Sequence, residues 1–414
     1  MPRKLNVYLY GRQVGQLLED SFGHLMFKYM ESAYPLSVRM PVSSLQYDER
    51  FTEPFFDNLT PEGDALRLIA SKFHISDNNV FSILNYIGGD CAGAVSLYSD
   101  KFQQHVDSPL KEINQEDLAK IIDELPANPL LTGIDNAPRL SLAGAQSKFA
   151  VYKGLDGKYY RSDDEHPTTH IIKITNKYFD GLLENELFCM SLAKKMFNDT
   201  PDVRLNLADG RKYLEITRYD RKQINNKIER LHQEDFCQVL GYLSRQKYQS
   251  DGGPKIPQLY NAIMEYSARK AIDGYKFIQL LIFNYLIGNT DAHAKNFSFL
   301  HINKENKVML APAYDLVSVD IYPEKVVSHN IAMTINGKIS YNKLRKKDWL
   351  ELFALLRLNS TSMMKELRKT FAGIVDSAQQ LTDELNKNQV TASAVYAKIL
   401  QNIKTRYNIL FGER

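Results

Sequence analysis

The segment YKFIQLLIFNYLIG, residues 275–288, constrains the fold more than any other stretch of this chain. Its apolar residues cover nearly every face of a helix, which predicts a buried helix over residues 275–287. Gln279 and Asn284 interrupt the apolar run, which is also too short to span a bilayer. Gly288 can supply the left-handed residue that often ends a helix. The polar sequence that follows, NTDAHAKNFSFL, is therefore held against a rigid support.

The strand and helix patterns of the sequence divide the chain into three parts. Residues 1–130 mix an alternating β-hairpin pattern with apolar helix patterns, and a linker containing Pro and Gly follows. Residues 136–225 carry β-branched strands and hairpin turns around one helix predicted at 181–197. Residues 226–414 read as helix nearly throughout. A chain of 414 residues has room for two or three domains. We therefore expect an α+β protein in which a β-rich lobe and an all-helical lobe follow a mixed α+β N-terminal domain.

Local signals predict where several elements begin and turn. Thr60 followed by Pro61 predicts a helix start, because the hydroxyl can cap free N–H groups and proline at the first helical position loses none that it needs. Asp156-Gly157 and Asp209-Gly210 each predict a tight β-hairpin turn, since this residue pair suits positive φ angles.

Composition excludes several classes of protein. The 52 basic and 49 acidic residues leave a net charge of +3, so charge alone does not predict binding to nucleic acid or to an anionic membrane. Cys91, Cys189 and Cys237 are odd in number and widely separated, which argues against a disulfide framework or a zinc ribbon and favours a reducing compartment. The N-terminus has no apolar core of signal-peptide length. We expect a cytoplasmic protein with no membrane partner.

Asp291 and Asn296 are the first candidates for catalysis, in the pattern D-x-H-x-x-N. Protein kinases use an Asp and an Asn at this separation, the Asp orienting or deprotonating the acceptor hydroxyl and the Asn binding Mg²⁺. Asp315 follows Asn296 by nineteen residues and offers a carboxylate oxygen to the same metal. The simpler interpretation is a polar loop in which Asp291 and its neighbours cap the next turn, and an isolated Asp such as Asp315 is common in turns.

Lys173 lies inside the strand pattern HIIKI, where it could neutralise nucleotide phosphates. A lysine in such a strand is more often solvated, at an edge or on an outer face. Glu186 on the following helix could orient Lys173, although a surface position is the usual one for a Glu on an amphipathic helix. The loop SLAGAQSK, residues 141–148, could bring backbone N–H groups to phosphates, but it matches neither common Gly-rich phosphate-binding pattern.

Other hydrolytic chemistries have little support. His166, His170 and His293 form no H-x-x-x-H pair and no G-x-S-x-G occurs, which disfavours a zinc hydrolase and the simplest serine hydrolase. The order of the candidates is more informative than any one of them. A small-residue loop, a strand lysine, a helix glutamate, a hinge, a buried helix, D-x-H-x-x-N and a final Asp follow one another, as phosphoryl transfer in a cleft between two lobes requires.

At this point the sequence resembles the HipA family, the kinase toxins of bacterial type II toxin–antitoxin operons. The resemblance implies a bilobal fold akin to protein kinases and phosphatidylinositol kinases. It extends over most of the chain in ordered blocks: FFDNLTPEG, GGDCAGAVSL, RLSLAGAQSKFAVY, PTTHIIKIT, NELFCMSLAK, RYDR, HQEDFCQVLG, SDGGP, LIGNTDAHAKNFSFL, LAPAYDLVS and IAMTINGK.

The resemblance implies a role for each matching position. Asp291 matches the catalytic Asp, and Asn296 and Asp315 match the two Mg²⁺ ligands. Ser141 matches the serine that family members autophosphorylate, an event that expels the loop and switches the kinase off, since the added charge is repelled from a site built for triphosphate. Tyr219 and its neighbours match the hinge that meets adenine. The positions expected to contact ATP are Leu142, Ala143, Gly144, Ala145, Gln146, Lys148, Lys173, Arg218, Tyr219, His293 and Lys295.

Some positions depart from the family pattern or keep two interpretations. Ser147 stands where family loops often carry Glu, and Thr217 stands at a hinge position that is often acidic. The QED segment, residues 233–235, is expected to be structural or helix-capping. His293 can brace its loop or approach the transferred phosphoryl group.

The resemblance also implies a function. It is that of an ATP- and Mg²⁺-dependent serine/threonine protein kinase toxin that phosphorylates a translation component and causes growth arrest and persistence. An aminoacyl-tRNA synthetase is the implied substrate, with glutamyl-tRNA synthetase first, and a HipB-like helix-turn-helix antitoxin is the implied partner, with operator DNA bound through their complex. Two alternatives stay open. One is a corepressor that acts mainly through that complex. The other is a small-molecule or lipid kinase, although the absence of an evident basic amphipathic membrane segment disfavours a lipid substrate.

Overall fold

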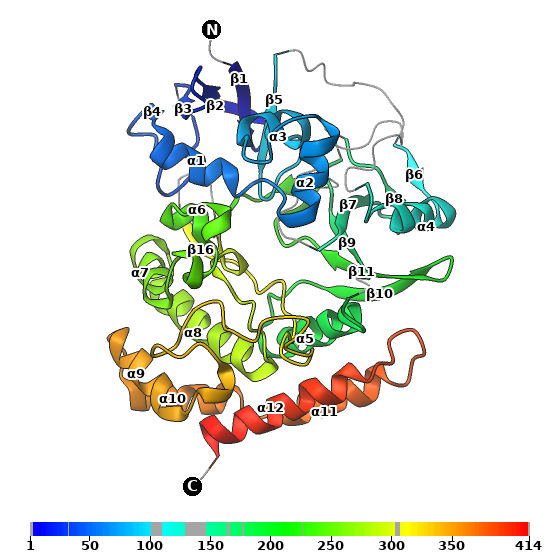
Figure 1. Cartoon of the computed structure of the whole chain (residues 1–414), viewed down its shortest axis with the longest axis vertical. Coiled ribbons are helices and arrows are strands. Elements are labelled where there is room, and N and C mark those ends of the chain that lie inside the picture. Colours follow the sequence, from blue (N-terminus) through cyan, green and yellow to red (C-terminus); the bar gives the residue numbers. More distant parts are fainter. Residues whose placement is uncertain are drawn as a thin grey trace. The chain divides into compact units, whose positions relative to one another are not determined.

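The computed structural model describes residues 3–31, 33–100, 110–128, 146–163, 166–175, 178–225, 227–302 and 307–412. The chain forms two compact units, each built from several stretches of sequence (Figure 1). Unit 1 comprises Met1–Ile174, Asn206–Ser244 and Ser298–Val308. Unit 2 comprises Thr175–Leu205, Arg245–Phe297 and Met309–Arg414. The positions named by the resemblance are therefore shared between two bodies.

Unit 1 begins with a five-stranded antiparallel sheet in the order β4-β3-β2-β1-β5. The predicted N-terminal hairpin is confirmed, with Leu5 opposite Leu17 and Val7 opposite Gly15. The first and third strands each bury one face, because apolar side chains alternate with polar ones along them. The strands are β1 (Arg3–Leu9), β2 (Arg12–Glu19), β3 (Leu25–Tyr29), β4 (Gln46–Tyr47) and β5 (Val95–Tyr98).

Three helices accompany this sheet: α1 (Glu49–Asp57), α2 (Gly63–Lys72) and α3 (Val80–Ile87). The helix start predicted at Thr60 is wrong. The Thr60 hydroxyl donates to the carbonyl oxygen of Asp57 at 2.7 Å, so it closes the end of α1 and leaves α2 to begin at Gly63. Ile69 and Ala70 are buried on α2.

The second sheet of unit 1 has the order β10-β11-β9-β7-β8-β6. Both predicted hairpins are present, and the division between the units falls inside β10. Helix α4 (Gln115–Glu124) packs its buried Leu118 and Ile121 into the same core as Phe149 and Ile172, so residues before 130 help to build this sheet's core. The strands are β6 (Glu112–Ile113), β7 (Lys148–Lys153), β8 (Tyr159–Tyr160), β9 (His170–Ile174), β10 (Val203–Ala208) and β11 (Arg211–Thr217).

Strands also occur beyond residue 226, where the sequence predicted helix. Here β13 (Lys227–Arg230) pairs with β12 (Arg221–Ile224), which precedes residue 226, and β14 (Gln233–Asp235) pairs with β15 (Ser298–His301). A further strand, β16 (Val308–Leu310), follows. Asp235 is the N-cap of α6 (Phe236–Leu240), where it forms a capping box with Gln238, so the helix-capping role expected for QED is confirmed at Asp235.

Unit 2 is helical, and the predicted buried helix is its centre. α8 packs against α7 and α12, and all but one of its residues from Phe277 to Ile287 are buried. α5 groups with this unit because it packs on α11 and α12, where Phe188 stacks on Tyr396 at 5.2 Å between ring centroids. The helices are α5 (Leu182–Met196), α7 (Ile256–Tyr266), α8 (Lys270–Ile287), α9 (Lys346–Leu355), α10 (Ser360–Thr370), α11 (Ile374–Leu385) and α12 (Val395–Phe411).

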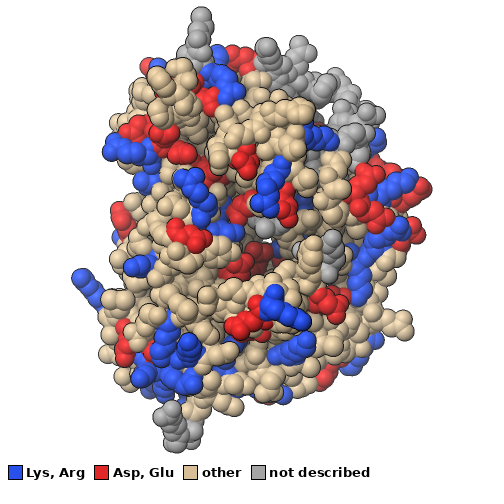
Figure 2. Space-filling view, viewed as in Figure 1, with Lys and Arg blue, Asp and Glu red and all other residues tan. Residues whose placement is uncertain are grey.

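The distribution of charge and the character of the helices both agree with the composition. Acidic and basic side chains are interspersed over the face drawn in Figure 2, with a gathering of Lys and Arg at the lower left, where Figure 1 has α9 and α10. Within the part of the chain that is described, no helix has the length and apolar character needed to cross a membrane.

Candidate active site

Gly288 ends α8 and sets the direction of the polar loop that follows. Its φ is +83°, and its N–H donates to the carbonyl oxygen of Asn284 at 3.0 Å, which confirms the predicted left-handed cap. A Cβ at this position would overlap Oδ1 of Asp320 and lie 2.7 Å from a guanidinium nitrogen of Arg406. Glycine is therefore required both by the backbone conformation and by the space.

The loop after Gly288 is fixed by hydrogen bonds to its own support. Asn289 donates from Nδ2 to Oδ1 of Asn284 at 2.8 Å, and its Oδ1 accepts from the backbone N–H of Asp291 at 3.2 Å. The Tyr341 hydroxyl donates to the carbonyl oxygen of Asn289 at 3.0 Å. The dense polar sequence is thus partly a scaffold, in which Asn284 and Asn289 place the backbone of Asp291.

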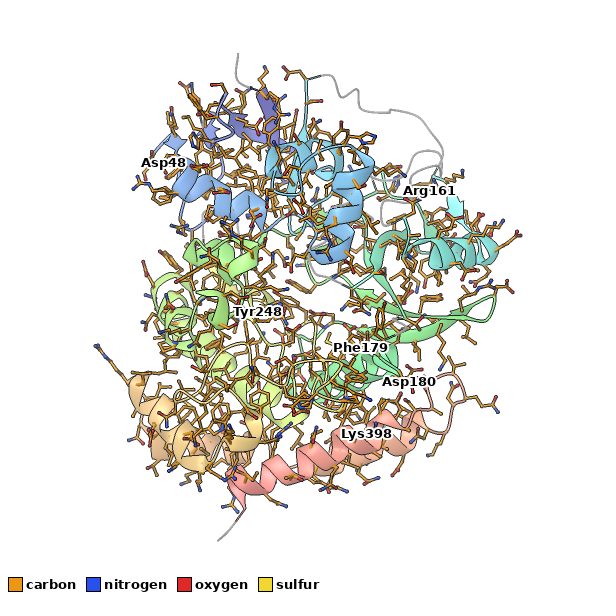
Figure 3. All side chains as sticks on the ribbon, in the orientation of Figure 1. Asp48, Arg161, Phe179, Asp180, Tyr248 and Lys398 are labelled. Carbon is orange, nitrogen blue, oxygen red and sulfur yellow. The ribbon has the colours of Figure 1, made fainter. Side chains whose placement is uncertain are left out.

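Asp291 and Asn296 are held in one constellation. Tyr248, labelled in Figure 3, donates its hydroxyl hydrogen bond to Oδ1 of Asp291 at 2.7 Å. Nδ2 of Asn296 donates to the carbonyl oxygen of Asp291 at 3.1 Å. With its Nδ2 used in this way, Asn296 keeps its side-chain oxygen as the atom that can meet a cation. The spacing D-x-H-x-x-N therefore corresponds to a direct contact between its two ends.

The segment that carries Asp315 lies beside this loop. The hydroxyl of Tyr314 donates to the carbonyl oxygen of Lys295 at 2.6 Å, so the residues next to Asp315 and Asn296 are joined. Asp315 has φ of +55°, a left-handed conformation that is uncommon for a residue with a side chain. A non-glycine residue kept in this conformation is a feature of functional sites.

Asn185 on α5 anchors the stretch after Asp315. Its Nδ2 donates to the carbonyl oxygen of Ser318 and its Oδ1 accepts from the Ser318 N–H, both at 2.8 Å. Burial raises the pKa of the Cys189 thiol, so this group stays neutral and lies 3.5 Å from Oδ1 of Asn185. Glu186, the next residue on α5, is fully buried and does not occupy the surface position usual for a Glu.

His293 and Lys295 are both buried within the loop, each with 6% of its surface exposed. The ring of His293 meets that of Tyr248 edge-to-face at 5.2 Å between centroids. The backbone of Ala294 donates to the carbonyl oxygen of Lys247 at 3.4 Å. His293 therefore braces the Tyr248 side of the loop, which is one of the two roles expected for it.

In unit 1, the candidate lysine lies on β9. Lys173 is only 5% exposed, because β9 is an inner strand between β7 and β11. The expectation of a solvated edge residue is therefore wrong. Lys148 lies directly opposite Lys173 in the β7–β9 pair, which places two ammonium-bearing side chains on one face of the sheet. Gln146 donates from Nε2 to the carbonyl oxygen of Ile174 at 3.4 Å, at the end of the same strand.

The segment after β11 carries the expected hinge residues. The Arg218 guanidinium is engaged with the Asp220 carboxylate at 2.7 Å and with the Thr168 hydroxyl at 2.8 Å, and the residue is 4% exposed. The side chain of Arg218 is therefore occupied by contacts within unit 1. Tyr219 is half-buried, and its hydroxyl donates to Oε1 of Gln233.

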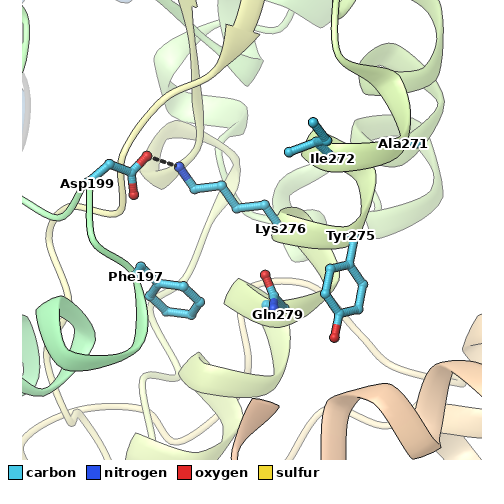
Figure 4. A pocket seen from close by; sticks show the side chains of 7 residues that line it. All are labelled: Phe197, Asp199, Ala271, Ile272, Tyr275, Lys276 and Gln279. Atoms are coloured by element: carbon cyan, nitrogen blue, oxygen red, sulfur yellow. Dashed lines mark hydrogen bonds and ion pairs between the residues drawn. The ribbon is translucent and has the colours of Figure 1, made fainter. Parts of the chain in front are cut away.

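Five of the expected positions, Ser141, Leu142, Ala143, Gly144 and Ala145, lie outside the described residues. The lining of the open cavity of about 460 Å³ in unit 2, drawn in Figure 4, includes no residue of the Asp291 loop. Its lining includes Lys276, whose ammonium group pairs with Asp199. Lys276 lies twelve residues before Gly288 along α8, roughly 18 Å at 1.5 Å per residue.

The donor set of the loop suits Mg²⁺ bound together with phosphates. Among the described residues no three His, Cys, Asp or Glu side chains cluster as a metal site. Mg²⁺ in kinases needs only one or two protein oxygens, because waters and phosphate oxygens complete its octahedron. An amide oxygen from Asn296 and a carboxylate from Asp315, on two segments joined by the Tyr314 hydrogen bond, fit that requirement.

Sequence reasoning did not find four residues that shape this site: Tyr248, Tyr314, Asn185 and Asn284. All four lie away from Asp291 in sequence or inside an apolar helix pattern. Asn284 could have been found, since an amide in an otherwise apolar buried helix requires a partner. Tyr248 carries no such signal, because its contact to Asp291 exists only in the folded chain.

The chain is similar to proteins of one family over most of its length. The HipA-like C-terminal domain model matches residues 140–385, and the HipA N-terminal domain model matches residues 5–98. The candidate kinase Y4mE of Sinorhizobium fredii is 35% identical over 92% of this chain and 93% of that protein. The serine/threonine-protein kinase toxin HipA of Shewanella oneidensis is 28% identical over 82% of this chain and 80% of that protein.

A solved structure shows the same fold. HipA of Shewanella oneidensis MR-1, in a complex with HipB and its operator DNA, matches with a TM-score of 0.85, covering 98% of this chain and 96% of that one at 24% identity. The expected α+β, kinase-like architecture is thereby confirmed for the whole described chain.

Proposed function

This chain belongs to the HipA family, and from that premise we propose that it is a protein kinase that transfers the γ-phosphate of ATP to a serine or threonine hydroxyl. The observation that carries the proposal is the Asp291 constellation. In the loop that follows a buried helix, Tyr248 fixes the carboxylate of Asp291, and Asn296 donates a hydrogen bond to the backbone carbonyl oxygen of Asp291. Phosphoryl transfer depends chiefly on such fixed placement.

Each residue of the constellation has a distinct task. Asp291 would orient the acceptor hydroxyl and take its proton as the new O–P bond forms and the bond from the γ-phosphorus to the β,γ-bridging oxygen breaks, which releases ADP. The oxygen of Asn296 and the carboxylate of Asp315 would hold Mg²⁺, which would supply positive charge to offset that of the phosphates. Lys173, opposite Lys148, supplies positive charge to the phosphates from a rigid inner strand. Tyr219 and the backbone beside it meet the adenine ring.

We propose Ser141 as the site of inactivating autophosphorylation. The proposal rests on the family to which the chain belongs, since Ser141 lies outside the described residues. A phosphoserine would add nearly two negative charges beside a site built to hold a triphosphate.

We also propose a HipB-like antitoxin as the partner, with operator DNA bound through that complex. The Shewanella oneidensis relative was solved with HipB and operator DNA, and this chain shares its fold over nearly its full length. An aminoacyl-tRNA synthetase, with glutamyl-tRNA synthetase first, is the proposed substrate, and growth arrest is the proposed consequence. A gel shift of the chain's own operator by antitoxin, with and without the kinase, tests the partner; an unchanged complex size would exclude it.

The kinase proposal is tested with labelled ATP and Mg²⁺ on wild type and on Asp291→Asn. We expect phosphate incorporation by the wild type and its loss in the variant, because the amide of Asn cannot accept the proton of the acceptor hydroxyl. Asp383→Asn is the matched control, since Asp383 is an exposed carboxylate on α11 of the same unit. Phosphosite mapping after expression of both proteins identifies the substrate from sites lost only in Asp291→Asn. Equal incorporation by Asp291→Asn would overturn the assignment.

A further inference from the structure

Five charged side chains meet in the interior of unit 1. Two are carboxylates and three are guanidinium groups, and each side chain is at most 14% exposed. Asp90 comes from the first domain of the chain, between α3 and β5, whereas the others come from the hinge segment and β13. The five residues are Asp90, Arg218, Asp220, Arg221 and Arg230.

Asp90 contacts three parts of the fold. Its Oδ1 lies 2.8 Å from Arg221 and 3.1 Å from Arg230. Its Oδ2 accepts from the Thr168 hydroxyl at 2.7 Å, and the same hydroxyl accepts from Arg218 at 2.8 Å. Asp90 therefore fastens the hinge arginines and also the residues that lead into β9, the strand of Lys173.

Asp220 forms the second half of the cluster. It receives two hydrogen bonds from Arg218, at 2.9 and 2.7 Å, and one from the backbone N–H of Gly93 at 2.8 Å. Arg221 donates to the carbonyl oxygens of Gly93 and Thr168, both at 2.9 Å. Gly93 therefore donates a hydrogen bond to Asp220 and accepts one from Arg221, the residue that follows Asp220.

The charges of the cluster are mutually dependent. Burial alone would raise the pKa of Asp90, but the guanidinium groups of Arg230, Arg221 and Arg218 lower it to about 2. Burial, together with the Arg218 charge, lowers the pKa of Arg221 to about 10. Three positive and two negative groups leave a net charge of +1, so the loss of one carboxylate leaves buried guanidinium charge without compensation.

Tyr219 lies in sequence between Arg218 and Asp220, two members of this cluster. Asp220 follows it directly, and the Gln233 side chain accepts the hydrogen bond of its hydroxyl. Gly93 has φ of +72°, and a Cβ there would lie 2.7 Å from the backbone nitrogen of Gln233. The loop around Gly93 therefore contacts Asp220, which follows Tyr219, and lies against Gln233, which accepts the hydrogen bond of the Tyr219 hydroxyl.

We propose that Asp90 is a positioning residue for nucleotide binding: through Arg218, Arg221 and Arg230 it holds the segment around Tyr219 in the conformation that meets the adenine ring. This inference rests on the proposed function, because it requires ATP to bind along that segment. The first domain then contributes to the affinity of the kinase for ATP without contacting the nucleotide through Asp90.

The test compares the full-length wild type with Asp90→Asn, by ATP kinetics and by calorimetric titration of a nonhydrolysable ATP analogue with Mg²⁺. We expect KM and Kd to rise about tenfold with kcat within about twofold, since Asp291 and the metal ligands are untouched. Asp100→Asn is the matched control, because its carboxylate is 53% exposed and pairs with Lys4 in the same unit. It should leave both constants unchanged.

A second variant covers the case in which Asp90→Asn does not fold, as judged by thermal unfolding. Thr168→Val keeps every charge and removes only the hydroxyl shared by Asp90 and Arg218. We expect a rise in Kd of about threefold with kcat preserved. Wild-type protein that fails to bind the analogue would contradict the proposed function itself. Wild type that binds, with folded Asp90→Asn or Thr168→Val binding equally well, would overturn only the role of Asp90.

Discussion

The hydroxyl of Tyr248 donates a 2.7 Å hydrogen bond to Oδ1 of Asp291. This contact fixes one carboxylate oxygen; under the proposed function, the other meets the acceptor hydroxyl. A hydrogen bond to a charged group contributes about 1.5–3 kcal/mol, so we expect Tyr248 to affect the rate as well as the local structure.

Replacing Tyr248 by Phe should lower kcat by about tenfold or more, because Asp291 loses the partner that restricts its rotamer. The KM for ATP should change by less than about twofold. The rate constant of autophosphorylation, measured in a single turnover at a series of ATP concentrations, checks both expectations. Tyr178→Phe serves as the control, since Tyr178 is 67% exposed in the same unit. A kcat for Tyr248→Phe equal to that of the control would contradict the positioning role.

Gly288→Ala should destabilise the fold by about 3 kcal/mol or more. The new methyl group overlaps Asp320, which pairs with Arg406, and φ is +83°. Gly337 separates the two causes, because it has φ of +70° and a Cβ added there would meet nothing within 4 Å. Gly337→Ala should therefore cost only about 1 kcal/mol. Urea unfolding of both variants makes the comparison; equal losses would show that the contact with Asp320 does not matter.

The acid stability of the protein should depend on Asp90. Its pKa is about 2 in the folded chain and about 3.9 in an unfolded one, a difference on the order of 3 kcal/mol. Because the folded pKa is the lower one, this contribution is complete above about pH 5 and is lost as the pH falls from about 4 through 2.

The free energy of unfolding of the wild type should therefore fall more steeply between pH 5 and pH 3 than that of Asp90→Asn. Urea titrations at pH 5, 4 and 3 measure the two slopes, with Asp100→Asn as the exposed control. Parallel slopes for wild type and Asp90→Asn would mean that Asp90 titrates normally.

Lys173→Met should abolish most of the stabilisation by ATP. Lys173 and Lys148 face the same side of the sheet, and the loss of one ammonium group weakens the attraction for phosphates. We expect a KM for ATP at least about tenfold higher and a smaller rise in Tm when ATP and Mg²⁺ are added. Lys158→Met is the control, because Lys158 is 54% exposed and pairs with Glu112. An unchanged nucleotide-induced Tm shift would exclude Lys173 from the phosphate site.

Local patterns predicted those elements whose conformation depends on neighbours in sequence. The buried helix α8, its cap at Gly288 and the hairpins at Asp156-Gly157 and Asp209-Gly210 agree with expectation, because periodicity and turn chemistry act over a few residues. Strands β14 and β15 were missed, since Gln233–Asp235 and Ser298–His301 acquire strand conformation only by pairing across more than sixty residues.

The sequence by itself determined the family, the kinase-like architecture and the candidate residues Asp291, Asn296, Asp315 and Lys173, since residue type and order along the chain carry that information. Tertiary structure alone decided that Tyr248 holds Asp291, that Lys173 is an inner-strand residue, and that Asp90 joins the hinge arginines. Those relationships are contacts between residues distant in sequence. They arise because burial forces each polar group to find a partner, and only the packed fold determines which partner is within reach.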